Sequence, residues 1–388
     1  MAKLRCIVVG CGGRAAGWLI PALAARSDAE VVALCDECLP RADHAARPCP
    51  TPPRTFRTVE EALRSVDCDV VAVTTGDAHH AEVVLPALAA GKTVFCEKPL
   101  ETTLDKCRAI VEADEKVGGR VFVGFNLRYA PVYDAVRAEI DRGTLGRVLT
   151  IQMDEFYDGG RTYFRRWNRL RVEGGGLWIT KASHDFDLMA WLAGSAPLQV
   201  AAFAERTHYV PKPEAARQCR FCQLAPTCPD RAPVKAAESL AVWEESGGPP
   251  HDLCLYNSDT DTFDHGIASV RFEGGVLGTY TCNVVTGLTD RRIRVSGTRG
   301  TLDGSLSADR LRLVRRDPTE AVDIPVGGGR AMHGGADGFV LESFLQFARG
   351  EAEPRCRPRE AALAIRIGLA ATRSADEGRT VAMGEFAL

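Results

Sequence analysis

Three glycines near the start of the chain have a spacing that can bind a diphosphate. Gly10, Gly12 and Gly13 follow a short apolar run, and Ala15 supplies a small side chain at the next fixed position. The first glycine permits a tight turn, the second lets the backbone approach a pyrophosphate, and Ala15 lets a helix pack closely on a strand. The N–H groups at the helix start would face the phosphates. A plain tight turn is the alternative.

An acidic residue favours the first interpretation. Asp36 ends the next apolar run, residues 31–35, where the ribose-binding carboxylate of a dinucleotide site is found. A carboxylate there can accept hydrogen bonds from both ribose hydroxyls and would repel a 2′-phosphate. The pattern therefore predicts a dinucleotide site that prefers NAD to NADP.

Two further polar clusters follow later apolar runs, at positions where open parallel sheets bind ligands. Pro99 restricts the preceding residues to an extended backbone, and Lys98 could then reach a ligand. On the residues alone, an ordinary surface turn is about as good an interpretation. The clusters comprise Thr74, Thr75, Asp77 and His80, and then Glu97, Lys98 and Pro99.

The cysteines between residues 205 and 262 suggest a metal site. Cys219 and Cys222 form a C-x2-C pair that can direct two thiolates at one ion, and Cys228 and Cys254 could complete a tetrahedral site, with His251 as a substitute ligand. We expect a structural zinc that stabilises this loop-rich insert, since four protein ligands leave no open position. An iron–sulfur cluster uses the same ligands. A local disulfide and free thiols are the other interpretations.

The elements that must position these residues alternate between strand and helix in the first third of the chain. This pattern predicts right-handed βαβ units around a parallel sheet, a Rossmann-type α/β domain over residues 1–125. Residues 126–388 form the second domain, with a Cys-rich insert at about 205–262. Strands are expected at 4–9, 31–35, 69–75, 93–96, 121–124, 263–273, 276–286 and 291–297, and helices at 15–25, 79–90, 102–117, 337–349 and 358–377.

Composition excludes several classes of function. The 388 residues carry 48 lysines and arginines against 51 aspartates and glutamates, a net charge of −3, so no basic excess drives nucleic-acid binding. No apolar run approaches the roughly 20 residues that a membrane crossing needs. The apolar run at the start is too short for an export signal. The 14 cysteines are therefore expected to be mostly reduced, in the cytoplasm.

Longer segments carry a family resemblance. The segments VVGCGGR, TTGDAHHAEVVLPALAAGKTVFCEKPL (74–100), VGFNLRYAP (123–131) and GGGLWITKASHDFDLMAWLAG (174–194) resemble the glucose–fructose oxidoreductase / inositol dehydrogenase / MocA (Gfo/Idh/MocA) family. The resemblance covers most of the chain. It implies a Rossmann domain followed by an α+β domain with a large, mainly antiparallel sheet. It also implies NAD- or NADP-dependent chemistry on the hydroxyls of polyols, and a homodimer or homotetramer joined through that sheet.

The resemblance also implies site residues. His184 matches the histidine that exchanges a proton with the reacting hydroxyl, and Lys98 points towards the substrate. Arg128, after the last strand of the first domain, is expected at the junction of cofactor and substrate. The cofactor set implied by pattern and resemblance is Gly10, Gly12, Gly13, Arg14, Asp36, Thr75, Asp77, His80, Glu97, Lys98 and Arg128.

One position departs from the family pattern. Many relatives carry an aspartate four residues before the histidine, where this chain has Thr180, followed by Lys181. Lys181 can share a helix face with His184, and its ammonium would lower the histidine's pKa and favour the neutral base. This hypothesis makes Lys181 a third catalytic residue. The alternative is a solvated lysine at the helix edge.

The predicted function is the NAD-dependent oxidation of a secondary hydroxyl of a sugar, glycoside or cyclitol, with His184 as base and Lys98 polarising the oxygen. A redox-neutral enzyme that oxidises transiently and then eliminates, hydrolyses or epimerises is the first alternative. A non-catalytic sugar-binding protein is the second. The substrate candidates are Arg166, Trp167, Thr180 and Asp259, of which the first two can equally belong to a lid or a subunit contact.

Overall fold

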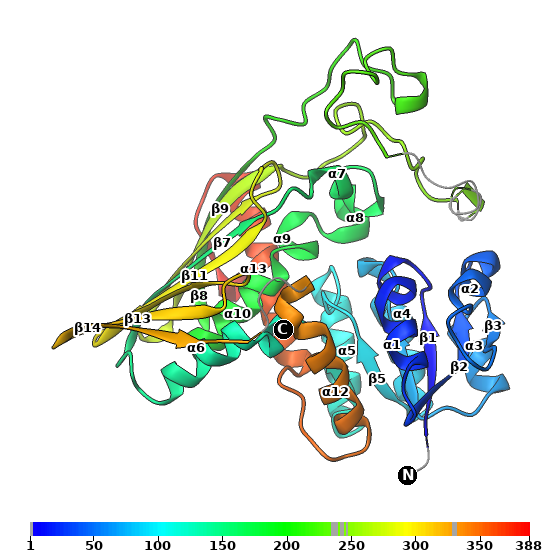
Figure 1. The fold of residues 1–388 in the computed structure, drawn as a ribbon, viewed down its shortest axis with the longest axis horizontal. Helices are drawn as coiled ribbons and strands as arrows, with labels where there is room; N and C mark the ends of the chain where they lie inside the picture. The colour runs from blue at the N-terminus through cyan, green and yellow to red at the C-terminus, as the bar shows by residue number, and fades with distance from the viewer. Residues whose placement is uncertain (1–2, 234–239, 241–243, 246, 328–331) are drawn as a thin grey trace.

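The computed structural model describes residues 3–233, 240, 244–245, 247–327 and 332–388. Two sheets, each with its own helices, form the body of the molecule, and the segment between β8 and β9 projects from it (Figure 1). Part of the expected insert lies outside the described residues. No described helix is long and apolar enough to cross a membrane.

The first sheet is parallel, and its described strands have the order β3-β2-β1-β4-β5-β6 of a dinucleotide-binding fold. The expected α/β domain is confirmed. Short β3 and helices α2 and α3 were not predicted, because they lack a strong apolar pattern. The strands are β1 (Leu4–Val9), β2 (Ala29–Cys35), β3 (Arg54–Phe56), β4 (Val70–Val73), β5 (Thr93–Cys96) and β6 (Val121–Val123). The helical segments are η1 (Ala15–Leu19), α1 (Ile20–Ala24), α2 (Leu39–Ala45), α3 (Val59–Ser65), η2 (Asp77–His79), α4 (His80–Ala89) and α5 (Leu104–Lys116).

The second sheet has the order β14-β13-β12-β11-β7-β10-β9-β8-β15 among the described strands. It is antiparallel except where β7 and β10 run parallel, which confirms the expected large, mainly antiparallel sheet. Buried and exposed residues alternate along β9, so one face packs on helices and the other lies open. The strands are β7 (Val148–Phe156), β8 (Pro197–Glu205), β9 (His265–Phe272), β10 (Leu277–Asn283), β11 (Asp290–Gly297), β12 (Gly300–Ser305), β13 (Arg310–Arg316), β14 (Thr319–Pro325) and β15 (Val381–Ala382).

Helices α6, α10 and α13 cover the packed face of the second sheet (Figure 1). A helical break separates α9 from α10, at the point where the sequence pattern suggested one continuous face. The described helical segments of this half are η3 (Asn126–Tyr129), α6 (Pro131–Asp141), α7 (Gly160–Tyr163), η4 (Trp167–Arg169), α8 (Arg171–Gly174), α9 (Leu177–Thr180), α10 (Ser183–Ala193), η5 (Cys219–Phe221), η6 (Glu273–Gly275), η7 (Met332–Gly335), α12 (Ala336–Ala348), α13 (Pro358–Glu377) and η8 (Met383–Phe386).

Helix α12 returns from the second half of the chain to the first sheet. Its Phe344 ring lies 5.1 Å from the ring centroid of Phe95 and 5.6 Å from that of Phe122, both in edge-on contact. This buried aromatic cluster fixes the start of α12 beside the glycine loop. The C-terminal part of the chain therefore contributes side chains to the site described next.

Candidate active site

The glycine loop has the shape that a pyrophosphate needs. Gly10 has a φ of +87°, and a Cβ there would lie 2.6 Å from the backbone nitrogen of Thr75. Only glycine fits this turn. At Gly12 and Gly13 a Cβ would meet nothing within 4 Å, so the backbone borders open space. The residues present therefore fit the diphosphate of NAD.

Asp36 is held at the end of β2 for a ribose. Its buried carboxylate accepts hydrogen bonds from the N–H groups of Cys11 (2.8 Å) and Cys38 (2.9 Å). The Arg41 guanidinium donates to the same carboxylate through Nε and Nη2, at 2.8–3.0 Å. These contacts fix the orientation of the carboxylate beside the glycine loop.

Arg14 joins three elements. Its Nε donates to Glu97 at 2.6 Å, its two terminal nitrogens donate to Asp337 at 2.9 and 3.2 Å, and its guanidinium lies over the ring of Trp18. Arg14 and Glu97 therefore tie the glycine loop to the end of β5 and to α12. Their predicted contacts with the cofactor stay a prediction.

Lys98 connects the two halves of the chain. Its Nζ donates to the backbone oxygen of Thr180, at the end of α9, at 2.9 Å. Burial lowers the pKa of Lys98, an effect that the carboxylates of Asp77 and Glu97 oppose. The lysine is therefore a fixed donor at the domain junction, as its predicted role requires.

His184 lies buried in the first turn of α10, with 4% of its surface exposed. Burial lowers the histidine's pKa well below its usual value, and the charge of Lys98 lowers it further. Smaller contributions come from Arg291, His333 and Lys181, in that order. The Nδ1 atom is buried and has no hydrogen-bond partner among the described residues. The imidazole is therefore neutral at ordinary pH, the form that can accept a proton.

The polar residues that follow β4, among them Thr75, Asp77 and His80, lie near Lys98. Burial raises the pKa of Asp77 to about 6, against the opposing charges of Lys98 and His80. The Thr75 hydroxyl and one Asp77 oxygen are buried without a partner in the described part of the chain, so they have capacity for a ligand. His80 instead bonds the backbone oxygen of Pro99 through Nδ1 at 2.7 Å. That contact supports the turn carrying Lys98.

Lys181 is largely buried and lies outside the helix that carries His184. It ends α9, and its Nζ lies 2.9 Å from Glu155 of β7 and over the ring of Tyr157. Burial alone would lower its pKa, but the charges of Glu155 and Tyr163 and the hydrogen bond to Glu155 together raise it. The break between the two helices separates Lys181 from the first turn of α10. Its charge still lowers the histidine's pKa, but less than that of Lys98 does.

Arg128 forms a buried ion pair. Its Nε and Nη2 each donate to Asp187 of α10 at 2.8 Å, and its Nη1 donates to Glu360 of α13 at 3.0 Å. All three nitrogens thus already have protein partners. These contacts favour a structural role, and the predicted contact with the cofactor stays a prediction.

The predicted substrate residues occupy different settings. Arg169 donates to Asp259 at 2.7 Å through Nε, which ties the segment after α7 to the insert. Arg166 is exposed and Trp167 half-buried. Thr180 is buried, and its backbone oxygen accepts the hydrogen bond from Lys98. The substrate roles of all four stay predictions.

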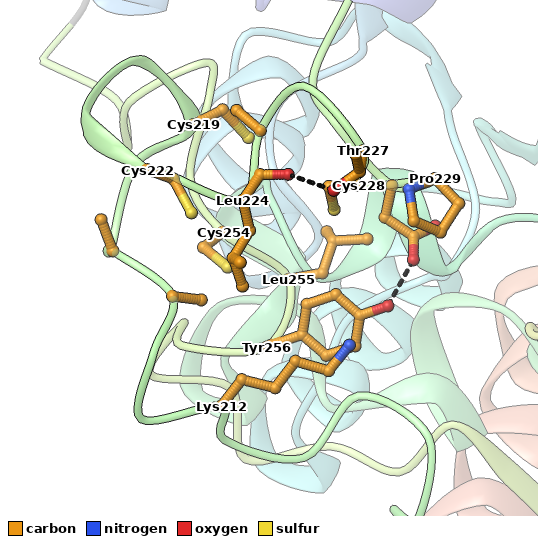
Figure 2. A pocket seen from close by; sticks show the side chains of 14 residues that line it. Lys212, Cys219, Cys222, Leu224, Thr227, Cys228, Pro229, Cys254, Leu255 and Tyr256 are labelled. Carbon is orange, nitrogen blue, oxygen red and sulfur yellow. Dashed lines mark hydrogen bonds between the residues drawn. The ribbon is translucent and has the colours of Figure 1, made fainter.

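The cysteines of the insert share a cavity of about 200 Å³ but not a metal site. Figure 2 shows Cys219, Cys222, Cys228 and Cys254 around this cavity, and all four are free thiols. Within the described residues, no group of three or more His, Cys, Asp or Glu side chains could hold a metal ion. The predicted zinc is therefore not supported. Cys219 begins η5 and Cys222 follows it directly, whereas Cys228 and Cys254 come from two other segments of the insert.

Several residues of this region had no signal in the sequence. Glu155 and Arg291, on neighbouring strands β7 and β11, form a buried ion-pair network with Asp185. His333 and Asp337, from η7 and α12, reach the site from the far end of the chain. Ion pairs between distant elements depend on the packing of the whole chain, and the spacing of residues within a short segment cannot predict them.

The fold and site together define a class, an oxidoreductase that binds NAD through a Rossmann domain. The family described as "Oxidoreductase family, NAD-binding Rossmann fold" (GFO_IDH_MocA) matches residues 4–125. Its companion, "Oxidoreductase family, C-terminal alpha/beta domain", matches residues 137–383. The chain belongs to the Gfo/Idh/MocA family of oxidoreductases.

Known relatives agree with this assignment. YteT of Bacillus subtilis, named as an oxidoreductase, is 27% identical over 350 residues, which span 82% of this chain and 80% of YteT. Inositol 2-dehydrogenase of Rhizobium meliloti is 31% identical over 47% of this chain, and the alignment spans 53% of that enzyme.

Solved structures share the fold. An oxidoreductase domain protein from Kribbella flavida has a TM-score of 0.76 at 20% identity, covering 99% of this chain and 100% of the other. The WlbA dehydrogenase of Bordetella pertussis, solved with NADH and UDP-GlcNAcA, has a TM-score of 0.71 at 22% identity, covering 98% of both chains.

Proposed function

We propose that this protein oxidises a secondary hydroxyl of a sugar, glycoside or cyclitol and passes the hydride to NAD. One observation carries the proposal. Lys98 follows β5 of the first sheet, and its Nζ donates to the backbone oxygen of Thr180, four residues before His184, so this contact joins the two domains where the parallel strands end. Ligands of open parallel sheets bind at this end.

The residues divide the chemistry between them. NAD, when bound, supplies the hydride acceptor. The neutral imidazole of His184 removes the hydroxyl proton, and the Lys98 ammonium stabilises the negative charge that grows on the oxygen. The glycine loop and Asp36 hold the diphosphate and the adenosine ribose. His184 is almost completely buried at the junction, and burial strengthens its interaction with the developing charge.

The substrate class is supported from two sides. Several relatives are named inositol 2-dehydrogenases, and they are 31–39% identical to this chain over 145–185 residues. The groups at the junction are a neutral base and the Lys98 ammonium, while the nearby cations Arg291 and Lys181 are already paired with carboxylates; this set suits an uncharged polyol better than a polyanion.

A screen of NAD reduction tests the proposal. Purified protein is mixed with NAD and a panel of inositols, sugars and glycosides, and NADH absorbance is followed. We expect turnover with at least one compound. His184→Asn should lower kcat by about 10²–10⁴-fold while NAD binding is retained. His265→Asn is the matched control, because that histidine lies exposed on β9 beside Asp264.

Two other outcomes would contradict the proposal. Conversion of a glycoside without net NADH would indicate redox-neutral chemistry. Sugar binding without conversion of any compound in the panel would indicate a non-catalytic protein.

We also propose that the protein forms a homo-oligomer through the open face of its second sheet. Phe203 of β8 and Ile267 of β9 are cross-strand partners on this face and are 70% and 53% exposed, and Leu277 of β10 is 50% exposed. Adjacent apolar side chains of this size mark an interface. Phe203→Glu should convert the oligomer to a monomer in light scattering, and an unchanged mass would contradict the proposal.

A further inference from the structure

A second histidine faces the proposed base. The ring centroids of His333 and His184 lie 6.2 Å apart, although the two residues belong to η7 and α10. Among the residues that the structure describes, His333 is the only non-glycine residue with a positive φ, at 51°. A backbone conformation of this kind is held by its surroundings and is frequent at functional sites.

An anchored carboxylate orients the second imidazole. His333 Nδ1 lies 3.0 Å from Oδ2 of Asp337. The other carboxylate oxygen, Oδ1, accepts hydrogen bonds from Arg14 and, at 2.7 Å, from Asn126. Burial alone would raise the pKa of Asp337, but the hydrogen bonds from His333 and Arg14 hold it well below its usual value. Asp337 is therefore a fixed anion whose contact orients the imidazole of His333.

The proton that His184 accepts cannot stay there. The histidine is buried, and Lys98, Arg291 and Lys181 surround it with positive charge. An imidazolium in this position is unfavourable, so in each turnover His184 must pass the proton to a group that can release it to solvent. Arg291 and Lys181 are already cations paired with carboxylates, and Lys98, as the ammonium that stabilises the reacting oxygen, has no lone pair, so none of the three can accept it.

We propose that His333, supported by Asp337, takes the substrate proton from His184 and releases it to solvent. The inference rests on the proposed dehydrogenase function. The side chain of His333 is 32% exposed, whereas His184 is almost completely buried, so the pair leads from the interior outwards. A gap of this size between two rings is one that a single water molecule can bridge.

The step balances. The alcohol loses its O–H proton to His184 and its C–H hydride to NAD+, and a C=O bond forms. His184 then passes a proton to His333, which gives one to water, so both imidazoles return to their neutral state. The net products are the ketone, NADH and one proton in solvent.

The test uses the full-length protein with the most active polyol of the NAD-reduction screen. His333→Asn keeps a polar side chain but cannot carry a proton. We expect kcat to fall by about tenfold to a hundredfold, with KM and NAD affinity nearly unchanged, and the solvent deuterium isotope effect on kcat to rise. His333→Ala leaves room for a small base, so added imidazole should restore kcat. His265→Asn, which removes another His–Asp pair, should change nothing.

Distinct outcomes overturn the inference. A His333→Asn enzyme with normal kcat, or one with raised KM and normal kcat, shows that His333 is at most a substrate contact. Failure of imidazole to restore a correctly folded, NAD-binding His333→Ala enzyme also refutes the relay. If the wild-type protein turns over no polyol, the proposed function fails first, and the relay fails with it.

Discussion

The contacts of Asp36 predict how its replacement changes cofactor preference. In Asp36→Ser, the carboxylate that would bind the ribose hydroxyls is lost, and the partly exposed Arg41 side chain loses its buried partner. The freed guanidinium then lies where the 2′-phosphate of NADP would bind. We expect the variant to lose affinity for NAD and to gain affinity for NADP.

The size of the change follows from these interactions. A hydrogen bond to a charged group contributes about 1.5–3 kcal/mol, so losing one or two weakens NAD binding by about 2–3 kcal/mol, or roughly 30-fold to 150-fold. Unit charges 4 Å apart interact by about 4 kcal/mol near a protein surface. Because Arg41 is partly exposed, we halve this figure to about 2 kcal/mol of gain for NADP. The preference should shift by about three orders of magnitude.

Calorimetric titration of both cofactors into the apo protein measures this change without a substrate. The double variant Asp36→Ser/Arg41→Ala is the matched control and should lose NAD binding without gaining NADP. The reasoning is refuted if Asp36→Ser keeps its preference for NAD, or if the double variant binds NADP as well as the single variant does.

Three other variants test separate parts of the structure. Lys181→Met removes a cation near His184, which favours the imidazolium and raises its pKa, so the acidic limb of the kcat/KM profile should move to higher pH. Gly10→Ala should abolish NAD binding in titrations, since its methyl group would lie 2.6 Å from backbone. Arg128→Met should lower the free energy of unfolding in urea by about 3–5 kcal/mol, because it leaves Asp187 buried and without its main partner.

Each of these variants has a control or a contradicting result. For Lys181→Met, an acidic limb of the kcat/KM profile that stays in place or moves to lower pH would contradict the prediction. Gly91→Ala has the same left-handed backbone with open space around it, so it should bind NAD normally. Arg359→Met breaks an exposed pair with Glu115 and should cost about 0.5 kcal/mol or less. If Arg359→Met lowered the free energy of unfolding as much as Arg128→Met does, burial of the ion pair would not explain the large effect expected for Arg128→Met.

Local spacing was enough to predict the cofactor loop. Gly10 and Asp36 each end a strand, and the order of strands in such a sheet brings those ends together whatever the rest of the chain does. The large, mainly antiparallel second sheet was expected from the resemblance and is confirmed. Short β3 was not predicted, because a three-residue strand leaves too little pattern to recognise.

The surroundings of the base could not be predicted in the same way. The sequence placed Lys181 on the face of His184, but the helix breaks between them and the lysine pairs with Glu155 of a distant strand. Asp337 reaches Arg14 from the other end of the chain, through the packing of α12 on the first sheet. The four cysteines of the insert do share one cavity, but sequence spacing could not show whether they would converge on a metal.

Isotope transfer tests the central claim most directly. The protein is incubated with NAD+ and a polyol carrying deuterium on its ring carbons, and the cofactor is then analysed by mass spectrometry. The account predicts NADH that carries one deuterium from the polyol, and almost none when Asn replaces His184. Oxidised polyol accompanied by unlabelled NADH, or equal labelling by the His184→Asn variant, would contradict it.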